Sequence, residues 1–539
     1  MKPANQSRDM IKGAFALTLA ALITKILSAV YRVPFQNIVG DVGFYIYQQV
    51  YPFYGVALAF STYGFPVIIS KLYAERKNKD DQIGLHRLLF VSAIFISLLG
   101  LTAFLVLFYG AEQIAKNMND PGLALLIKVI SIVFLIIPVT SVLRGYFQGE
   151  GNMIPTAYSQ VGEQLFRVGT ILTAAILLMK TKGDLYVVGS GAVFGSVIGG
   201  LAAFIILVFF RWMKRRKEKT PFPKLGDLLD LRETGGLMKI LFFQGFAVCI
   251  SSMLLVFMQL ADSLNLYSLL IANGINGEDA KELKGIFDRG QPLVQLGSVV
   301  ATSMSLSLVP LISSAKIQKD ANFLYEKIKL SLQISIAFGL GAAVGLATII
   351  KPTNIMLFKN AHGSDVLAML SMMILLSSMI ITIVAILQGL GSMVFPAVMV
   401  LLGFSFKYIL NLVLVPIGGT MGAAIATNSS LLIILGILLV RLFIIIKKRV
   451  VSFRFLAVIA LAALCMFVVL KVFLFGTDFL RGFGDNRLLA SLQALSAVVI
   501  GGVTYLFVVI RGKVFTMEEL TLLPFGSKIM YLFPKMNRR

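Results

Sequence analysis

Apolar runs of about eighteen residues or more recur along almost the whole chain, and they constrain the fold more than any other sequence feature. Each run can cross a hydrocarbon core about 30 Å thick as a helix. Only 14% of the residues are charged, against roughly 25% in an average soluble domain. The sequence predicts an all-α polytopic membrane protein with about fourteen transmembrane helices. The expected spans are 11–33, 44–70, 85–109, 122–147, 155–179, 186–210, 237–262, 286–313, 330–350, 364–388, 396–415, 420–446, 455–475 and 488–510.

The distribution of Lys and Arg predicts the orientation of these spans. Both residues are frequent in the amino-terminal tail, in several loops that follow even-numbered spans and in the carboxyl-terminal tail, and they are rare in the other loops. By the positive-inside rule, both termini are expected in the cytoplasm. The densest basic cluster, over 211–219, directly follows the sixth span and contains Trp212. We therefore assign the net charge of +23 to contact with lipid headgroups and not to nucleic acid.

Several kinds of chemistry are absent from the sequence pattern. The Walker pattern of ATP-hydrolysing pumps does not occur. His86 and His362 lie far apart, and Cys249 and Cys465 both fall inside apolar runs. We therefore expect neither a metal or redox cofactor nor an enzymatic reaction.

A short motif occurs twice and indicates an internal repeat. Residues 148–153 read Gln-Gly-Glu-Gly-Asn-Met before Pro155, and residues 388–393 read Gln-Gly-Leu-Gly-Ser-Met before Pro396. The offset is 240 residues, and a second match, Pro66 with Pro310, has an offset of 244. Both offsets span six helices, so the two halves have the same orientation in the membrane.

The repeat predicts two parallel six-helix lobes around a central cavity. The expected units are an N-lobe over 1–212, a basic cytoplasmic linker over 213–236 and a C-lobe over 237–450. Residues 451–539 are expected to add two further spans and a cytoplasmic tail.

Charged residues inside the spans are the strongest candidates for function, because charge is costly in hydrocarbon unless it faces a cavity or a partner. The cations outnumber the anions. The cations are Lys25, Arg32, Lys128, Arg144, Arg167, Lys407 and Lys471; the anions are Glu163 and Asp262, with the pair Asp288 and Arg289 at the start of the eighth span. An excess of positive charge favours an anionic ligand such as a phosphate or diphosphate over an organic cation.

Some of the cations have a second interpretation. Lys128, Arg144 and Lys471 lie near enough to span ends for their charges to reach the headgroup region. Lys25 and Arg32 are seven residues apart and share one helical face, and we expect both to face the substrate.

The acidic residues also leave alternatives open. Glu163 and Arg167 are spaced i,i+4, so they form either part of a substrate site or a buried structural ion pair. Asp262 either neutralises a cation of its lobe or binds a coupling ion, Na⁺ or H⁺. The pair Asp288 and Arg289 is either functional or a solvated pair at a helix start.

Several motifs resemble a known family. They are Thr24 to Ser28, Tyr63 to Pro66, Ile69 to Leu72, Arg144 to Gly149, and Pro155 followed by Ser159, Gln160, Glu163 and Arg167. With fourteen spans in two lobes, the chain resembles the SpoVB/MurJ-like polysaccharide transporters of the multidrug/oligosaccharidyl-lipid/polysaccharide exporter superfamily. The similarity covers the whole chain.

The resemblance implies a flippase in a bacterial cell membrane. Its substrate would be an undecaprenyl-diphosphate-linked sugar, such as lipid II or a capsule or teichoic-acid precursor, and its basic cavity residues would hold the diphosphate. Lys25 and the pair Asp288 and Arg289 match basic and Asp-Arg positions of the family. The family's acidic residue before the proline of span 8 has no counterpart, because Gly290 and Gln291 precede Pro292.

The expected site combines the residue-based and family-based assignments. The substrate-binding candidates are Lys25, Arg32, Arg144, Glu163, Arg167, Asp288, Arg289 and Lys407, and the coupling candidates are Asp262 and Glu163. The rival functions are a multidrug exporter driven by Na⁺ or H⁺ and a membrane scaffold that transports nothing.

Overall fold

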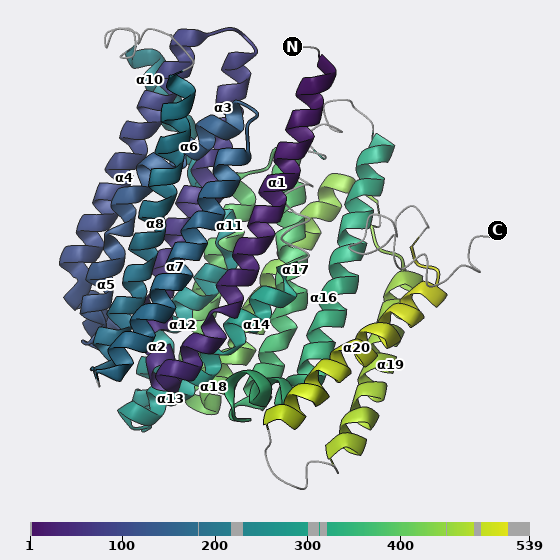
Figure 1. Ribbon diagram of the computed structural model, residues 1–539. Coiled ribbons are helices and arrows are strands. Elements are labelled where there is room, and N and C mark those ends of the chain that lie inside the picture. Colours follow the sequence, from purple (N-terminus) through teal and green to yellow (C-terminus); the bar gives the residue numbers. More distant parts are fainter. Residues whose placement is uncertain are drawn as a thin grey trace.

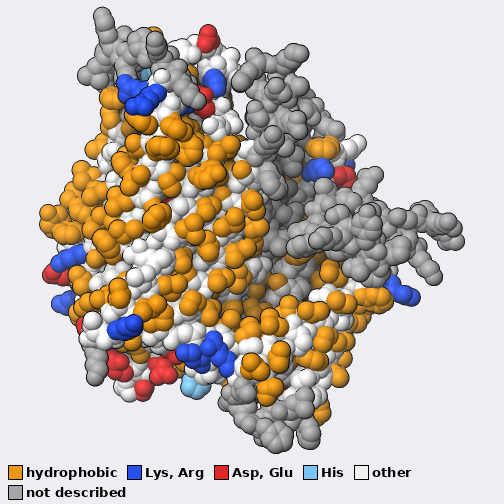
Figure 2. Space-filling model, viewed as in Figure 1, with side chains coloured by type: hydrophobic (Ala, Val, Ile, Leu, Met, Phe, Trp, Pro, Cys, Tyr) orange, Lys and Arg blue, Asp and Glu red, His pale blue; other side chains and the backbone are white. Residues whose placement is uncertain are grey.

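The computed structural model describes residues 3–181, 183–216, 230–299, 312, 321–448, 450–478 and 487–515, and every regular element in these ranges is helical. Within these ranges, twelve helical segments are long and apolar enough to cross a membrane. Hydrophobic side chains cover most of the middle of the visible face, whereas charged side chains gather toward its upper and lower ends (Figure 2). The prediction of a multi-pass, all-α membrane protein is confirmed.

The N-lobe comprises α1 to α8. Its elements are α1 (Pro3–Val30), α2 (Arg32–Leu58), the π-helix η1 (Ala59–Gly64), α3 (Phe65–Lys77), α4 (Gln82–Asn117), α5 (Leu123–Ser131), α6 (Val133–Gly149), α7 (Ile154–Lys180) and α8 (Leu185–Arg215). The helical stretch from Ala16 to Lys77 has 62 residues, whereas one crossing needs only about 20. Gly40, with φ 73°, breaks this stretch and allows the chain to turn back for a second crossing.

The C-lobe comprises α10 to α18. Its elements are α10 (Leu231–Ile240), the π-helix η2 (Leu241–Gly245), α11 (Phe246–Ser252), α12 (Leu254–Ala272), α13 (Gly277–Asp288), α14 (Gly290–Gly297), α16 (Ala321–Phe358), α17 (Ser364–Gly389) and α18 (Val394–Ile446). Gly419, with φ 54°, divides the 53 residues of α18 into two crossings. Two helices follow, α19 (Phe453–Asp478) and α20 (Arg487–Arg511).

The seventh span is longer than predicted, and the helix α13 (Gly277–Asp288) lies mostly in the predicted loop between the seventh and eighth spans. The course from α10 to α12 runs from Leu231 to Ala272, with a break at Met253. The short helix α13 then begins at Asn276, whose side chain accepts a hydrogen bond from the Asp279 backbone N–H. Hydropathy does not reveal this helix because it is amphipathic and carries acidic residues in its first turn. The eighth span, predicted over 286–313, is described over 286–299, where it contains α14, and at residue 312.

The turn at the repeated motif has the same backbone geometry in both halves. α6 ends at Gly149 and α17 ends at Gly389, which are 240 residues apart. The positive-φ residues Gly151 (φ 85°) and Gly391 (φ 88°) follow these ends and are also 240 residues apart. In each turn, the N–H of that glycine donates to the carbonyl of the Gln three residues earlier. The second repeat mark, at Pro310, lies outside the described residues.

The two lobes lie side by side, and the last two helices stand at one edge (Figure 1). α19 and α20 pack on α16 and add to the C-lobe. α1 crosses between the lobes and contacts both α7 and α14. We call the two ends of the bundle the α10 end, at the top of Figure 1, and the α13 end, at the bottom. α1 begins and α20 ends on the α10 side, consistent with an even number of crossings.

The lobes touch each other at both ends. At the α10 end Arg87 of α4 forms an ion pair with Glu233 of α10, and η1 packs on α11 deeper in the bundle. A Cβ atom added at Gly64 would lie 1.8 Å from Cys249 Sγ, so only glycine permits this approach. At the α13 end α2 packs on α12 and α13. Described residues of the two lobes therefore contact each other at both ends of the bundle.

Candidate functional site

Arg167 of α7 is buried among tyrosines of α2 and Tyr31, the residue between α1 and α2. Its Nη2 donates to the hydroxyls of Tyr31 at 3.0 Å and Tyr47 at 2.9 Å, and its guanidinium carbon lies 4.1 Å from the ring centroid of Tyr54. No carboxylate of the described residues forms an ion pair with Arg167, whose exposure is 0%. The positive charge is therefore stabilised by hydroxyl dipoles and ring faces and is not neutralised.

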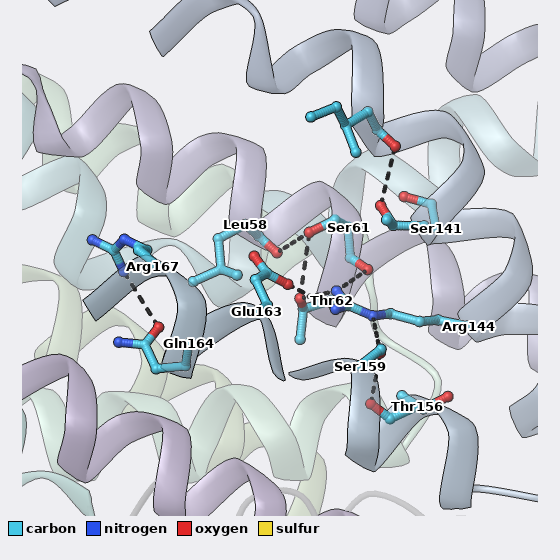
Figure 3. A network of polar contacts seen from close by, with 12 residues as sticks. Leu58, Ser61, Thr62, Ser141, Arg144, Thr156, Ser159, Glu163, Gln164 and Arg167 are labelled. Atoms are coloured by element: carbon cyan, nitrogen blue, oxygen red, sulfur yellow. Dashed lines mark hydrogen bonds and ion pairs between the residues drawn. The ribbon is translucent and has the colours of Figure 1, made fainter. Parts of the chain in front are cut away.

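Glu163 pairs with Arg144, and not with Arg167 as the i,i+4 alternative suggested. Arg144 Nη2 lies 2.7 Å from Glu163 Oε2, and Tyr54 donates a further hydrogen bond to Glu163. The remaining Arg144 nitrogens donate to Ser159, Thr62 and the Ser61 carbonyl (Figure 3). The last two acceptors lie in η1.

This network gives Arg144 and Glu163 a structural role. Arg144 has an exposure of 0%, so its charge does not reach the headgroup region. All of its nitrogens have acceptors within the protein, and a charge-assisted network of this kind stabilises the irregular backbone of η1. Arg144 and Glu163 are thereby less suited to hold a substrate than the sequence suggested.

Arg32 and Lys25 are two further span cations that form no ion pair within the described residues. Arg32 begins α2 and is fully buried, with the tyrosine hydroxyls of Tyr31 and Tyr51 as its polar neighbours and no carboxylate partner among the described residues. Its guanidinium carbon lies 4.2 Å from the ring centroid of Tyr51. Lys25 lies seven residues earlier and is partly buried. The described residues place no carboxylate within ion-pair distance of either cation.

Asp288 and Arg289 lie in the protein interior and have different partners. Arg289 forms a bidentate ion pair with Asp41 of α2, with Nε–Oδ1 and Nη2–Oδ2 distances of 2.9 and 2.5 Å. Asp288 pairs with Lys284 at 2.7 Å within α13. The interpretation as a solvated pair is wrong, because Asp288 and Arg289 are 3% and 0% exposed. The Asp41–Arg289 pair joins the two lobes at the α13 end.

Asp262 and Lys407 form a buried ion pair in the C-lobe. Lys407 Nζ lies 2.8 Å from Asp262 Oδ1, and the exposures of the two residues are 0% and 2%. The sequence left open whether Asp262 neutralises a cation or binds a coupling ion. The geometry places a cation of the chain itself against this carboxylate.

The other cations of the spans lie at the protein surface. Lys128 pairs with Glu112 at 2.7 Å, and Lys471 is exposed on α19. These two positions agree with a headgroup-facing role.

The basic cluster after the sixth span also has internal partners. Lys214 lies 2.8 Å from Glu150, and Arg216 stacks on Trp212 at 3.8 Å. Hydrogen bonds from Lys214 and Tyr73, together with the charges of Lys214 and Lys77, outweigh burial and lower the pKa of Glu150 to about 2. The cluster beyond Arg216 lies outside the described residues.

Comparison with known proteins identifies the family. The family described as "Polysaccharide biosynthesis protein" matches residues 10–316. The chain belongs to this family. The uncharacterized membrane protein YabM of Bacillus subtilis is 46% identical over 96% of this chain and 95% of its own length. The lipid II flippase MurJ of the same organism is 26% identical over 93% of this chain and 95% of its own length.

A solved structure supports the fold of this family member. The inward closed conformation of a lipid II flippase MurJ superimposes with a TM-score of 0.65 at 17% identity, and covers 91% of this chain and 97% of that one. The resemblance to SpoVB/MurJ-like transporters is therefore confirmed.

Sequence reasoning missed several residues that shape the site of this family member. Asp41 was placed in a loop, although it binds Arg289 across the lobe interface. Tyr47, Tyr51 and Tyr54 follow i,i+4,i+7 spacing on α2 and enclose the guanidinium groups. That spacing was a usable signal for a shared helical face. Asp41 offered none, because its partner is 248 residues away.

Proposed function

We propose that the protein is a flippase that moves undecaprenyl-diphosphate-linked envelope precursors to the outer leaflet by alternating access. A sugar-diphosphate head cannot enter hydrocarbon, whereas a polyprenyl tail need not leave it. The observation that supports this most is Arg32, a fully buried guanidinium for which the described residues provide no carboxylate partner. A charge of this kind is costly in a membrane protein unless a ligand compensates for it.

Arg32 and Arg167 flank one tyrosine and together suit a diphosphate. Their guanidinium carbons lie 4.2 and 5.4 Å from the Tyr51 ring centroid. Guanidinium groups match phosphate oxygens with paired N–H donors, so two of them can hold the two phosphates of one headgroup. Lys25, on the same face as Arg32, would add a third positive charge along the path of the head.

The orientation and the energy source are part of the same proposal. With basic loops inside, the α10 end faces the cytoplasm and the α13 end faces outward, where the Asp41–Arg289 pair must break for release. An inside-negative membrane potential favours outward movement of negative charge by about 2.3 kcal/mol per charge per 100 mV. Transport would therefore require no ATP.

The multidrug exporter is less consistent with the geometry. Coupling through Glu163 or Asp262 would need a carboxylate free to exchange H⁺ or Na⁺, and Arg144 and Lys407 occupy these two carboxylates. A scaffold that transports nothing gives no reason to retain the unpaired Arg32.

Proteoliposomes with a fluorescent polyprenyl-diphosphate-linked sugar test the proposal through the fraction of label that reaches the other leaflet. Arg32→Gln removes a charged hydrogen-bond donor worth about 1.5–3 kcal/mol, so we expect a loss of about 10- to 100-fold in transport. Lys471→Gln, which removes an exposed membrane cation, should transport as the wild type does.

Two results would contradict the proposal. One is unchanged transport by Arg32→Gln in well-folded protein. The other is a wild-type protein that moves organic cations but no lipid-linked sugar. Rescue of a strain depleted of its lipid II flippases would then distinguish lipid II from capsule or teichoic-acid precursors.

A further inference from the structure

Three oxygen atoms enclose the Lys407 ammonium in the C-lobe. Nζ lies 2.8 Å from Asp262 Oδ1, 2.6 Å from the Ala423 carbonyl oxygen and 2.6 Å from Thr427 Oγ1. A lysine ammonium has three N–H donors, so each donor has an acceptor. Lys407 is completely buried. We call these three oxygens and the ammonium the Lys407 cage.

The oxygen atoms of the cage are of the types that bind hard metal cations. Carboxylate, hydroxyl and backbone carbonyl oxygens are the usual ligands of such ions. Asn411 holds the carboxylate in place, because its amide nitrogen donates to Asp262 Oδ1 at 3.0 Å and to Asn265 Oδ1 at 2.8 Å. The cage therefore offers one negative charge and several neutral oxygens to a single positive charge.

The cage joins three helical segments. Asp262 lies on α12, Lys407 on the arm of α18 before the break at Gly419, and Ala423 and Thr427 on the arm after it. A positive charge at the centre holds these segments together, because without it the Asp262 carboxylate would be buried unpaired.

The repeat relates Lys407 to Arg167 of the N-lobe, since the two positions differ by the same 240 residues as the repeated turn. Within the described residues, Arg167 has tyrosine partners and no carboxylate, whereas Lys407 has a carboxylate. The two lobes therefore differ electrostatically. The N-lobe cation remains positive toward its surroundings, and the C-lobe cation is neutralised.

We propose that Lys407 is a tethered cation, whose ammonium occupies an oxygen site that would otherwise take a free alkali-metal ion such as Na⁺. The chain then supplies the charge that holds α12 to both arms of α18, and neither stability nor transport depends on Na⁺ at this position. The transport part rests on the proposed flippase function. The binding part does not.

Thermal unfolding of the purified protein in detergent tests the binding part, with NaCl compared with choline chloride at equal ionic strength. The wild-type unfolding temperature should be the same in both salts. Lys407→Ala should unfold at a lower temperature in choline chloride, and its unfolding temperature should rise with NaCl concentration, as expected for a ligand that binds only the folded state. The control Lys407→Ala/Asp262→Asn removes both charges and should show no preference for Na⁺.

Three other results would overturn the proposal that Lys407 is a tethered cation. A wild-type protein stabilised specifically by Na⁺ would overturn it, because the cage would then accept a free ion despite Lys407. The proposal is also overturned if the unfolding temperature of Lys407→Ala does not change with NaCl concentration. It is overturned as well if Lys407→Ala remains unfolded in NaCl while the double variant folds.

Transport in the two salts separates this inference from the proposed function. The wild type should move the lipid-linked sugar equally well in both, and Lys407→Ala should do so only with Na⁺. If the wild type moves nothing in either salt, the flippase proposal fails while the unfolding data still decide the cage.

Discussion

Replacing Asp41 by Asn tests whether its pair with Arg289 holds the two lobes closed at the α13 end. The side chains of the pair are 12% and 0% exposed, and the contact is bidentate. Removing one partner of a buried ion pair typically costs about 3–5 kcal/mol. Because Asn354 and Asn360 still accept from Arg289, we expect a value near the lower end, about 3 kcal/mol. That energy shifts the equilibrium toward the form open at this end by about a hundredfold.

Distances between spin labels on the two lobes would report this opening. Labels at Asp184, before α8, and Asp365, in the first turn of α17, lie on exposed positions at the α13 end. The native cysteines, Cys249 and Cys465, would first be replaced by Ala. We expect the wild type to give mainly one short distance and Asp41→Asn to populate a longer one.

Asp288→Asn provides the matched control. It breaks an equally buried pair with Lys284, but that pair lies within α13 and does not join the lobes. This variant should lose stability without a change in the distance distribution. The reasoning is refuted if Asp41→Asn leaves the distances unchanged, or if Asp288→Asn opens the lobes to the same extent.

Two further predictions concern stability and are measured by thermal unfolding. Glu163→Gln leaves Arg144 buried without a counterion and should destabilise the protein by about 3 kcal/mol; an unchanged unfolding temperature would show that the hydroxyl partners of Arg144 suffice. Gly151→Ala and Gly391→Ala force a side chain into positive φ and should each cost about 1–2 kcal/mol, whereas Gly169→Ala, in open space on α7, should be neutral or stabilising. Equal effects at all three glycines would contradict the conformational explanation.

The helical spans were predictable because the bilayer imposes a local rule. A crossing needs about twenty consecutive apolar residues, whatever the rest of the chain does. The repeated turn was also predictable, since Gly151 and Gly391 are needed where φ is positive. The helix α13 was missed because it is short and amphipathic and lies outside this rule.

The candidate site was predictable residue by residue, but its pairing was not. Charge inside an apolar run marked Arg144, Arg167 and Lys407 individually. The i,i+4 spacing suggested Arg167 as the partner of Glu163, yet Arg144 of another helix takes that carboxylate. Local spacing failed here because tertiary packing of α6 against α7 and η1 decides which cation reaches it.

The amino-acid sequence alone determined that this chain crosses a membrane many times as two similar halves, and that it buries more positive than negative charge. Both properties follow from local composition, because hydrocarbon tolerates only apolar helices and a few compensated charges. Only the tertiary structure decided which charges are compensated: it joins Asp41 to Arg289 and Asp262 to Lys407, and it gives Arg32 no carboxylate partner among the described residues. Such pairs connect residues more than a hundred positions apart, so packing and not sequence proximity sets them.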